Sequence, residues 1–136
     1  MKKYVPYLLI LVILLSACTT QATSLIGKWK LISYGSADSL TAAVPDADAA
    51  LTFSDDGTLT GSGGCNSLGG EYTVEGNQIT FGAITSTLMA CDEARSAQES
   101  AVMQVLTNTA EFELEDQTLT ITNNSMVLVF TSVPME

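Results

Sequence analysis

The segment that follows residue 24 alternates between apolar and polar side chains. Within residues 26–34, Trp29 and Leu31 fall on one side of an extended chain, and Ile32 and Tyr34 fall on the other. A period of two is typical of a β-strand, so this segment is predicted to be the first strand. Residues 35–48 contain Gly, Ser, Asp and Pro and are predicted to form a loop.

Three hairpins are predicted further along the chain. In each, two short alternating runs flank a turn of acidic residues with Gly, Asn or Gln, at residues 55–57, 75–77 and 115–117. A last strand is predicted at residues 126–130. Every position there is apolar, so this strand is expected to be central and covered on both faces.

One segment has a different period. Asp92 is the predicted N-cap of a helix, and Glu93 follows at the positive end of the helix dipole. Apolar residues then recur every three or four positions, which predicts an amphipathic helix that ends near Asn108. Its apolar stripe is Ala94, Ala97, Ala101, Val102, Val105 and Leu106. The patterns together predict six to eight short strands and one helix that lies against the sheet or closes one end of it.

The first seventeen residues have the organisation of a bacterial export signal. Two lysines precede an apolar run at residues 7–15, which is shorter than the roughly 20 residues that cross a bilayer. The run ends in Leu15-Ser16-Ala17-Cys18, which resembles the lipobox of bacterial lipoproteins. The resemblance implies that residues 1–17 are removed and that Cys18 is acylated. Because two or more acyl chains anchor a protein stably, residues 18–24 are expected to tether the domain to a membrane.

The expected location is the cell envelope. Thr19 follows Cys18, in place of the aspartate that retains lipoproteins at the inner membrane of enteric bacteria. The outer membrane is therefore expected in a cell that has one, and the outer face of the plasma membrane in a cell that does not.

Charge and composition exclude several classes of function. Beyond residue 17, Lys28, Lys30 and Arg95 stand against fifteen acidic residues, a balance that repels nucleic acid and anionic lipid headgroups. The chain has no histidine, which is the commonest general base and metal ligand. We therefore expect no catalytic residues, no enzymatic activity, no cofactor and no metal.

Three stretches taken together resemble the META domain, also called the HslJ-like family. Residues 25–31 read L-x-G-x-W-x-L. Residues 53–72 contain F-x-x-D-G, then G-x-G-G-C-N, then G-x-Y. Residues 87–91 read T-x-M-A-C and precede the predicted helix, which carries Gln98-Glu99. The resemblance implies a domain at residues 25–133 with a small mixed or antiparallel sheet, folded on itself into a buckled pseudo-barrel with one helix.

The resemblance also bears on function. Members of this family are mostly envelope or secreted proteins, linked in bacteria to heat induction, novobiocin tolerance and motility. It implies no enzymatic activity.

Two cysteines remain once Cys18 carries lipid. In an oxidising compartment Cys65 and Cys91 could form a disulfide, act as a redox-active pair or remain free thiols. Structural zinc is disfavoured because it takes four ligands. The paired cysteines of the family fall on these two positions, so the resemblance implies a Cys65–Cys91 disulfide.

Other candidate sites have simpler structural explanations. The glycine-rich residues 61–70 lack the Lys-Ser or Lys-Thr of a phosphate loop, so they are expected to supply positive φ or close backbone approach where the sheet buckles. The aromatic residues Trp29, Tyr34, Tyr72 and Phe81 could line a ligand pocket, but core packing is favoured.

Three functions compete. The leading hypothesis is a monomeric, membrane-anchored envelope module that binds a protein or a small apolar ligand, or has a structural role, in envelope stress tolerance. The second is a lipocalin-like carrier, because Gly27-Lys28-Trp29 resembles the lipocalin G-x-W. The position of the helix and the small size for an eight-stranded cup oppose it. The third is an inhibitor of a basic envelope hydrolase, suggested by the acidic surface.

Overall fold

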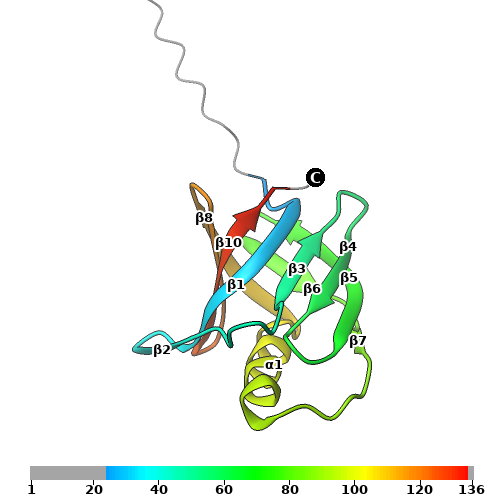
Figure 1. The fold of residues 1–136 in the computed structure, drawn as a ribbon. Coiled ribbons are helices and arrows are strands. Elements are labelled where there is room, and N and C mark those ends of the chain that lie inside the picture. Colours follow the sequence, from blue (N-terminus) through cyan, green and yellow to red (C-terminus); the bar gives the residue numbers. More distant parts are fainter. Residues whose placement is uncertain (1–23, 135–136) are drawn as a thin grey trace, which may run out of the picture.

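The computed structural model describes residues 24–134 (Figure 1). The predicted signal peptide, the predicted lipidation site Cys18 and all but the last residue of the predicted tether lie outside the described residues. The one helix among residues 24–134 has thirteen residues, and no helix of this part of the chain is long and apolar enough to cross a membrane.

Ten strands and one helix make up the domain. In chain order they are β1 (Gly27–Ser36), β2 (Ser39–Ala42), β3 (Ala50–Phe53), β4 (Thr58–Ser62), β5 (Ser67–Glu75), β6 (Gln78–Phe81), β7 (Thr85–Ser86), α1 (Glu93–Val105), β8 (Thr109–Glu115), β9 (Thr118–Asn123) and β10 (Met126–Val133).

The sheet closes on itself. Its order is β10-β9-β8-β6-β5-β4-β3-β1-β2, and β10 also pairs with β1. Of the ten strands, β2 pairs only with β1 and β7 only with β5, which leaves a closed ring of eight. Every pairing is antiparallel, and the expected pseudo-barrel with one helix is confirmed. The chain is therefore large enough for an eight-stranded barrel, contrary to the expectation from its size.

The interior of the barrel is filled with side chains. Phe53, Leu59, Ile79 and Leu128 are among the inward residues with no exposed surface. A ring of eight strands is just wide enough for such side chains to meet at its centre. Phe53 also packs edge to face against the ring of Tyr72, with ring centroids 5.0 Å apart. The hydrophobic core therefore lies inside the ring.

The three predicted hairpins are present, and their turns fall where expected. The last strand is central, as expected, because β10 lies between β1 and β9, but it is not fully covered on both faces, since Met126 and Val129 are only partly buried. The predicted loop at 35–48 was partly wrong, because residues 39–42 fold back on β1 as the short strand β2.

A bulge in β1 corrects the predicted position of Tyr34. Leu31 pairs with Phe130 and Ser33 with Val129, so Ile32 has no partner on β10. A bulge reverses the alternation of the residues that follow it. Tyr34 therefore packs against the core on the same side as Leu31, while Ile32 stays exposed.

The helix begins as predicted, but it ends at Val105, three residues before the expected end near Asn108, and its buried face differs. Asp92 caps it by accepting the Arg95 backbone N–H at 3.0 Å. Ala94 and Ala97 are exposed, although both were assigned to the apolar stripe. Gln98, which is fully buried, takes their place on the inward face at the start of the helix.

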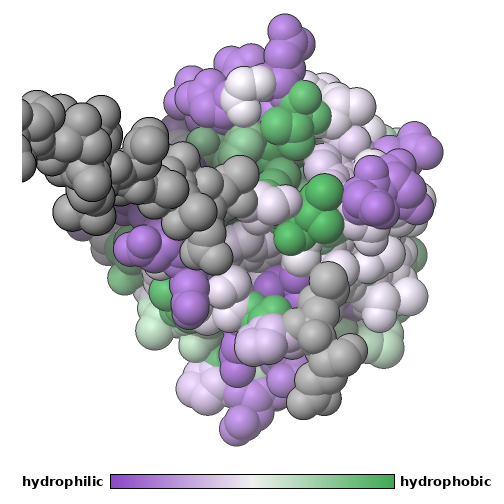
Figure 2. Space-filling view, turned by 90° about the horizontal axis from the view of Figure 1, so that it is seen from above, coloured by the Kyte–Doolittle hydropathy of each residue, from purple (hydrophilic) through white to green (hydrophobic). Residues whose placement is uncertain are grey.

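The barrel has two different ends (Figure 1). The helix end carries α1, which packs against β1, β9 and β10, together with the connections at residues 62–67 and 82–92. At the opposite end β1 begins, β10 ends and the three predicted hairpins turn. We call this the tether end, since the segment before residue 24 joins the domain there. Figure 2 looks onto it and shows hydrophilic side chains around the rim with hydrophobic ones between them.

Two glycines of the 61–70 stretch are required by close approach, as expected. A Cβ at Gly61, where φ is +153°, would overlap the carbonyl oxygen of Ala50 on β3. A Cβ at Gly70 would lie 2.9 Å from the backbone carbonyl oxygen of Ala83. Glycine is the residue that admits both contacts.

Candidate functional site

Asn66 joins three segments at the helix end. Its side chain is almost fully buried, and its Oδ1 accepts the Met89 backbone N–H at 2.6 Å and the Thr87 hydroxyl at 3.0 Å. Its Nδ2 donates to Glu99 Oε1 on α1 at 2.6 Å. One amide therefore fixes the 85–91 loop to the end of β4 and to the helix.

Glu99 completes the connection between the helix and the residues after β4. Its Oε2 accepts the backbone N–H groups of Asn66 at 2.5 Å and of Cys65 at 3.2 Å. A Cβ at Gly63 would lie 3.0 Å from the Glu99 Cα, so glycine lets the helix approach this closely. A carboxylate that accepts several N–H groups makes charge-assisted hydrogen bonds, which are stronger than neutral ones.

Gln98, whose side chain is fully buried, makes a second connection. Its Oε1 accepts the Val44 backbone N–H at 2.7 Å, and its Nε2 donates to the Gly63 carbonyl at 2.8 Å. A Cβ at Gly64 would lie 2.5 Å from this Nε2. Both glycines of the G-G-C-N motif therefore make room for side chains of the helix.

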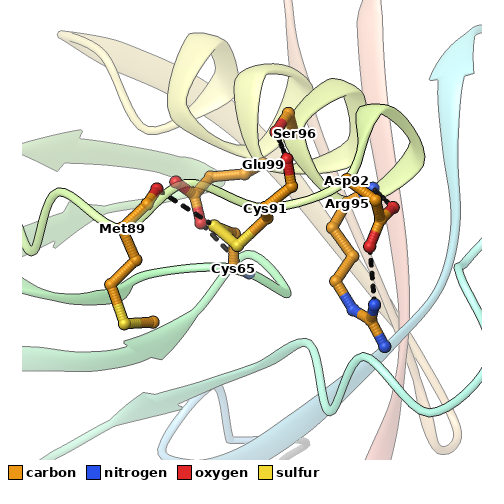
Figure 3. Close-up of polar contacts among 7 residues, drawn as sticks. All are labelled: Cys65, Met89, Cys91, Asp92, Arg95, Ser96 and Glu99. Carbon is orange, nitrogen blue, oxygen red and sulfur yellow. Dashed lines mark hydrogen bonds and ion pairs between the residues drawn. A yellow bond between two sulfur atoms is a disulfide. The ribbon is translucent and has the colours of Figure 1, made fainter.

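The structure joins Cys65 to Cys91 in a disulfide, with their Cα atoms 6.0 Å apart (Figure 3). This is the pairing implied by the family resemblance. Cys91 directly precedes the N-cap Asp92, so the crosslink ties the start of α1 to the end of β4. Beside it, the backbone N–H and then the guanidinium of Arg95 hold the pKa of the Asp92 carboxyl below its usual value.

The loop held by these contacts presents an apolar tip. Leu88 is 96% exposed and Met89 is 60% exposed, although the Thr87 hydroxyl and the Met89 backbone N–H both donate to Asn66 and Cys91 is held by the disulfide. We call Leu88 and Met89 the apolar tip. An exposed apolar pair on an immobilised loop is suited to binding, because little conformational entropy is lost when a partner docks.

The four aromatic candidates do not form a pocket within residues 24–134. Trp29 and Tyr72 are buried in the core, where the indole Nε1 donates to the Leu25 carbonyl and the phenol to the Ser54 carbonyl, both at 2.7 Å. Burial, and then the charges of the acidic turn 55–56, raise the pKa of Tyr72. Tyr34 packs against the core.

Phe81 is also buried, beside a shallow depression of about 500 Å³ next to Met103 and Leu106. The core-packing expectation therefore describes all four aromatic residues. In residues 24–134 no group of three or more Cys, Asp or Glu residues could hold a metal ion.

Sequence reasoning did not assign functional or structural roles to Asn66, Gln98 and Glu99, although all three lie in the motifs of the family resemblance. One local signal could have indicated the role of Gln98. This polar residue stands at a helical position that continues the buried face of Val102 and Val105. Hydrogen bonds between segments more than thirty residues apart cannot be read from such a local pattern.

The domain belongs to a class of small capped barrels. Its antiparallel barrel is closed, and a disulfide and buried polar side chains fix a helix across one end. Such a fold fits a binding module. The chain belongs to the META domain family, whose family model matches residues 23–134.

Solved structures support the fold. An NMR structure of a protein from Burkholderia xenovorans is 27% identical, with a TM-score of 0.65 over 80% of this chain and 83% of that one. A DUF4847 family protein from Bacteroides vulgatus is 16% identical, with a TM-score of 0.59 over 81% and 94%. A lipocalin-like protein from Bacteroides uniformis is 16% identical, with a TM-score of 0.53 over 80% and 98%. No curated protein matches the sequence.

Proposed function

We propose that this chain is a lipid-anchored, non-enzymatic binding module of the bacterial cell envelope that recognises a protein partner through its apolar tip. The apolar tip is the observation that carries the proposal. It lies on a loop that Asn66 and the disulfide hold at the end of the barrel opposite the tether. Leu88 would otherwise cost solubility without contributing to the core.

The anchor is tested by Cys18→Ala. We expect the wild-type chain in the membrane fraction, with its N-terminal peptide beginning at Cys18 and carrying acyl chains by mass spectrometry. The variant should lose the acyl mass and retain residues 1–17, because the thiol that accepts the lipid is gone. Wild-type protein found in the cytosol with an intact first residue would end this part of the proposal.

The apolar tip is tested by a double variant, Leu88→Ser with Met89→Ser. Crosslinking in native membranes should recover a partner with the wild-type chain and lose it with this variant. The subsequent binding measurement should show a loss of about thirtyfold or more, as for residues at the centre of an interface.

The matched control is Val74→Ser on β5, which removes apolar surface from a side chain exposed to 47%. The control should retain the partner, and equal recovery with all three chains would contradict the recognition role. A role in envelope stress tolerance is tested in a strain that lacks this protein. The wild-type protein, the double variant and Val74→Ser are each expressed in that strain, and its stress tolerance is compared.

A carrier of a small apolar ligand is the second candidate, favoured by the closed eight-stranded ring. The fully buried Phe53 and Phe130 oppose it, because a ligand inside the barrel would have to displace such side chains. Lipid extraction of the purified protein distinguishes the two functions, since a carrier yields a stoichiometric ligand in addition to the acyl chains of its anchor.

A further inference from the structure

Charge is segregated around the barrel. Five exposed glutamates lie on two strands: Glu71 and Glu75 on β5, and Glu111, Glu113 and Glu115 on β8. These strands flank β6, which lies across the ring of eight from β1. The lysines of the described chain, Lys28 and Lys30, are both exposed on β1. The acidic and basic residues of the strands therefore occupy opposite sides of the barrel.

The basic side is also apolar. Ile26, Lys28, Lys30 and Ile32 occupy alternating positions and are all exposed, the isoleucines to 48% and 45%, while Trp29 and Leu31 between them are buried. We call these four residues the β1 stripe. Apolar side chains beside lysines are typical of surfaces that bind at a membrane interface. There the apolar side chains enter the interface, and the lysines extend toward the headgroups.

The strands beside the stripe carry no acidic side chain next to it. The residues paired with Lys28 are Thr52 on β3 and Val133 on β10. The residues paired with Lys30 are Ala50 and Thr131. Both lysines line a depression of about 480 Å³ with Asp48, Ala50 and Val133.

The lysines are available to an external anion. Across residues 24–134 the ion pair formed is Arg95 with Asp92, at the helix end, so neither lysine is in a salt bridge and Asp48 is not within ion-pair distance of them. A two-lysine surface without a bound carboxylate attracts phosphate-bearing headgroups when it is held close to them.

The point at which the chain enters the domain indicates what binds the β1 stripe. Ser24, the first described residue, lies four positions before Lys28, and Cys18 lies six positions before Ser24. Six residues span at most about 20 Å, so an anchored Cys18 keeps the β1 stripe close to the bilayer. The occupant closest to the stripe is then the membrane that holds the anchor.

We propose that the β1 stripe docks on anionic phospholipid headgroups of the membrane to which Cys18 is anchored, so that the barrel lies on its side. This inference rests on the proposed lipid anchor. Lys28 and Lys30 contact headgroup phosphates, and Ile26 and Ile32 enter the interface beside them.

The acidity of the whole chain does not oppose this orientation. The glutamates of β5 and β8 lie on the side of the barrel that faces away from the bilayer, and salt screens their repulsion of the headgroups. An upright orientation is disfavoured, because the turns of the tether end carry Asp55, Asp56 and Asp116. The apolar tip follows β7, which pairs with β5, so the side-on barrel leaves it on the side that faces away from the bilayer.

Amine footprinting of the purified lipidated protein tests the docking. Once residues 1–17 are removed, Lys28 and Lys30 are the only lysines of the chain. Acetylation of each is measured by mass spectrometry in phosphatidylglycerol–phosphatidylcholine vesicles and in phosphatidylcholine vesicles. We expect acetylation to be about tenfold slower on the anionic vesicles at low salt, and to recover at high salt.

Two variants make the result specific. Gln78→Lys places a reference amine on β6, across the ring from β1, and its acetylation should be the same on both vesicles. Lys28→Glu should restore fast acetylation of Lys30 on anionic vesicles. Equal slowing of the reference amine, or no slowing at Lys28 and Lys30, would overturn the docking.

The same samples separate this inference from the proposed anchor. Flotation with the vesicles and the acyl mass of the N-terminal peptide report the anchor alone. A protein that does not float refutes the anchor, whereas one that floats with fully reactive lysines refutes only the docking.

Discussion

Replacing Cys65 and Cys91 together by alanine is expected to lower the free energy of unfolding by about 3 to 4 kcal/mol. The disulfide closes a loop with a sequence separation of 26 residues, and this is the loss that the chain-entropy relation gives for a loop of that size. Chemical denaturation monitored by the fluorescence of Trp29, which is buried in the core, measures it.

The reductant provides an internal control for this prediction. Reduction should lower the unfolding midpoint of the wild-type protein to that of the double variant and leave the variant unchanged. Alkylation before reduction should label neither Cys65 nor Cys91. Free thiols in the wild-type protein, or equal stability of the two proteins, would show that the crosslink does not stabilise the domain.

The second large effect is expected for Gln98→Leu, which should cost about 2 to 4 kcal/mol. Leucine fills a similar volume but leaves the Val44 N–H and the Gly63 carbonyl without their partner. Each buried group left unpaired costs about 1–3 kcal/mol. The helix end should loosen most, because Gln98 joins α1 to two separate connections there.

Gln104→Leu is the matched control, since it makes the same chemical change at an exposed position of the same helix. Its free energy of unfolding should stay within about 0.5 kcal/mol of wild type. Wild-type stability for Gln98→Leu would mean that the two backbone groups find other partners, and the amide would lose its assigned role.

These two connections also bear on binding. The disulfide and the polar network fix the loop on which Leu88 and Met89 stand. If the loop were free, binding would have to order it, and affinity would fall. The fold thus places stabilising contacts directly beneath the surface proposed to recognise a partner.

Local patterns predicted those elements whose signals are local. The turn at Asp55-Asp56-Gly57 and the helix cap at Asp92 fall where the sequence places them, because each depends on neighbouring residues alone. The bulge at Ile32 was not predictable in this way, since it is defined by the register between β1 and β10, which are almost a hundred residues apart.

The helix shows the same division within one element. Its start follows from Asp92, and its approximate extent from the period of its apolar residues. Its buried face does not, because Ala97 is apolar but exposed, whereas Gln98 is polar and fully buried. Burial at that position was decided by the two backbone groups that Gln98 meets, and these belong to segments far away in the chain.

The sequence by itself determined the eight strands of the ring, their three hairpin turns, the helix and, through the family motifs, the pairing of Cys65 with Cys91, but not the short strands β2 and β7. Only the tertiary structure decided that β1 meets β10 to close the ring, and that the glutamates of β5 and β8 lie across it from Lys28 and Lys30. The physical reason is range. Propensity and turn chemistry act between neighbours, whereas the sides of a closed barrel exist only after every strand has found its partners.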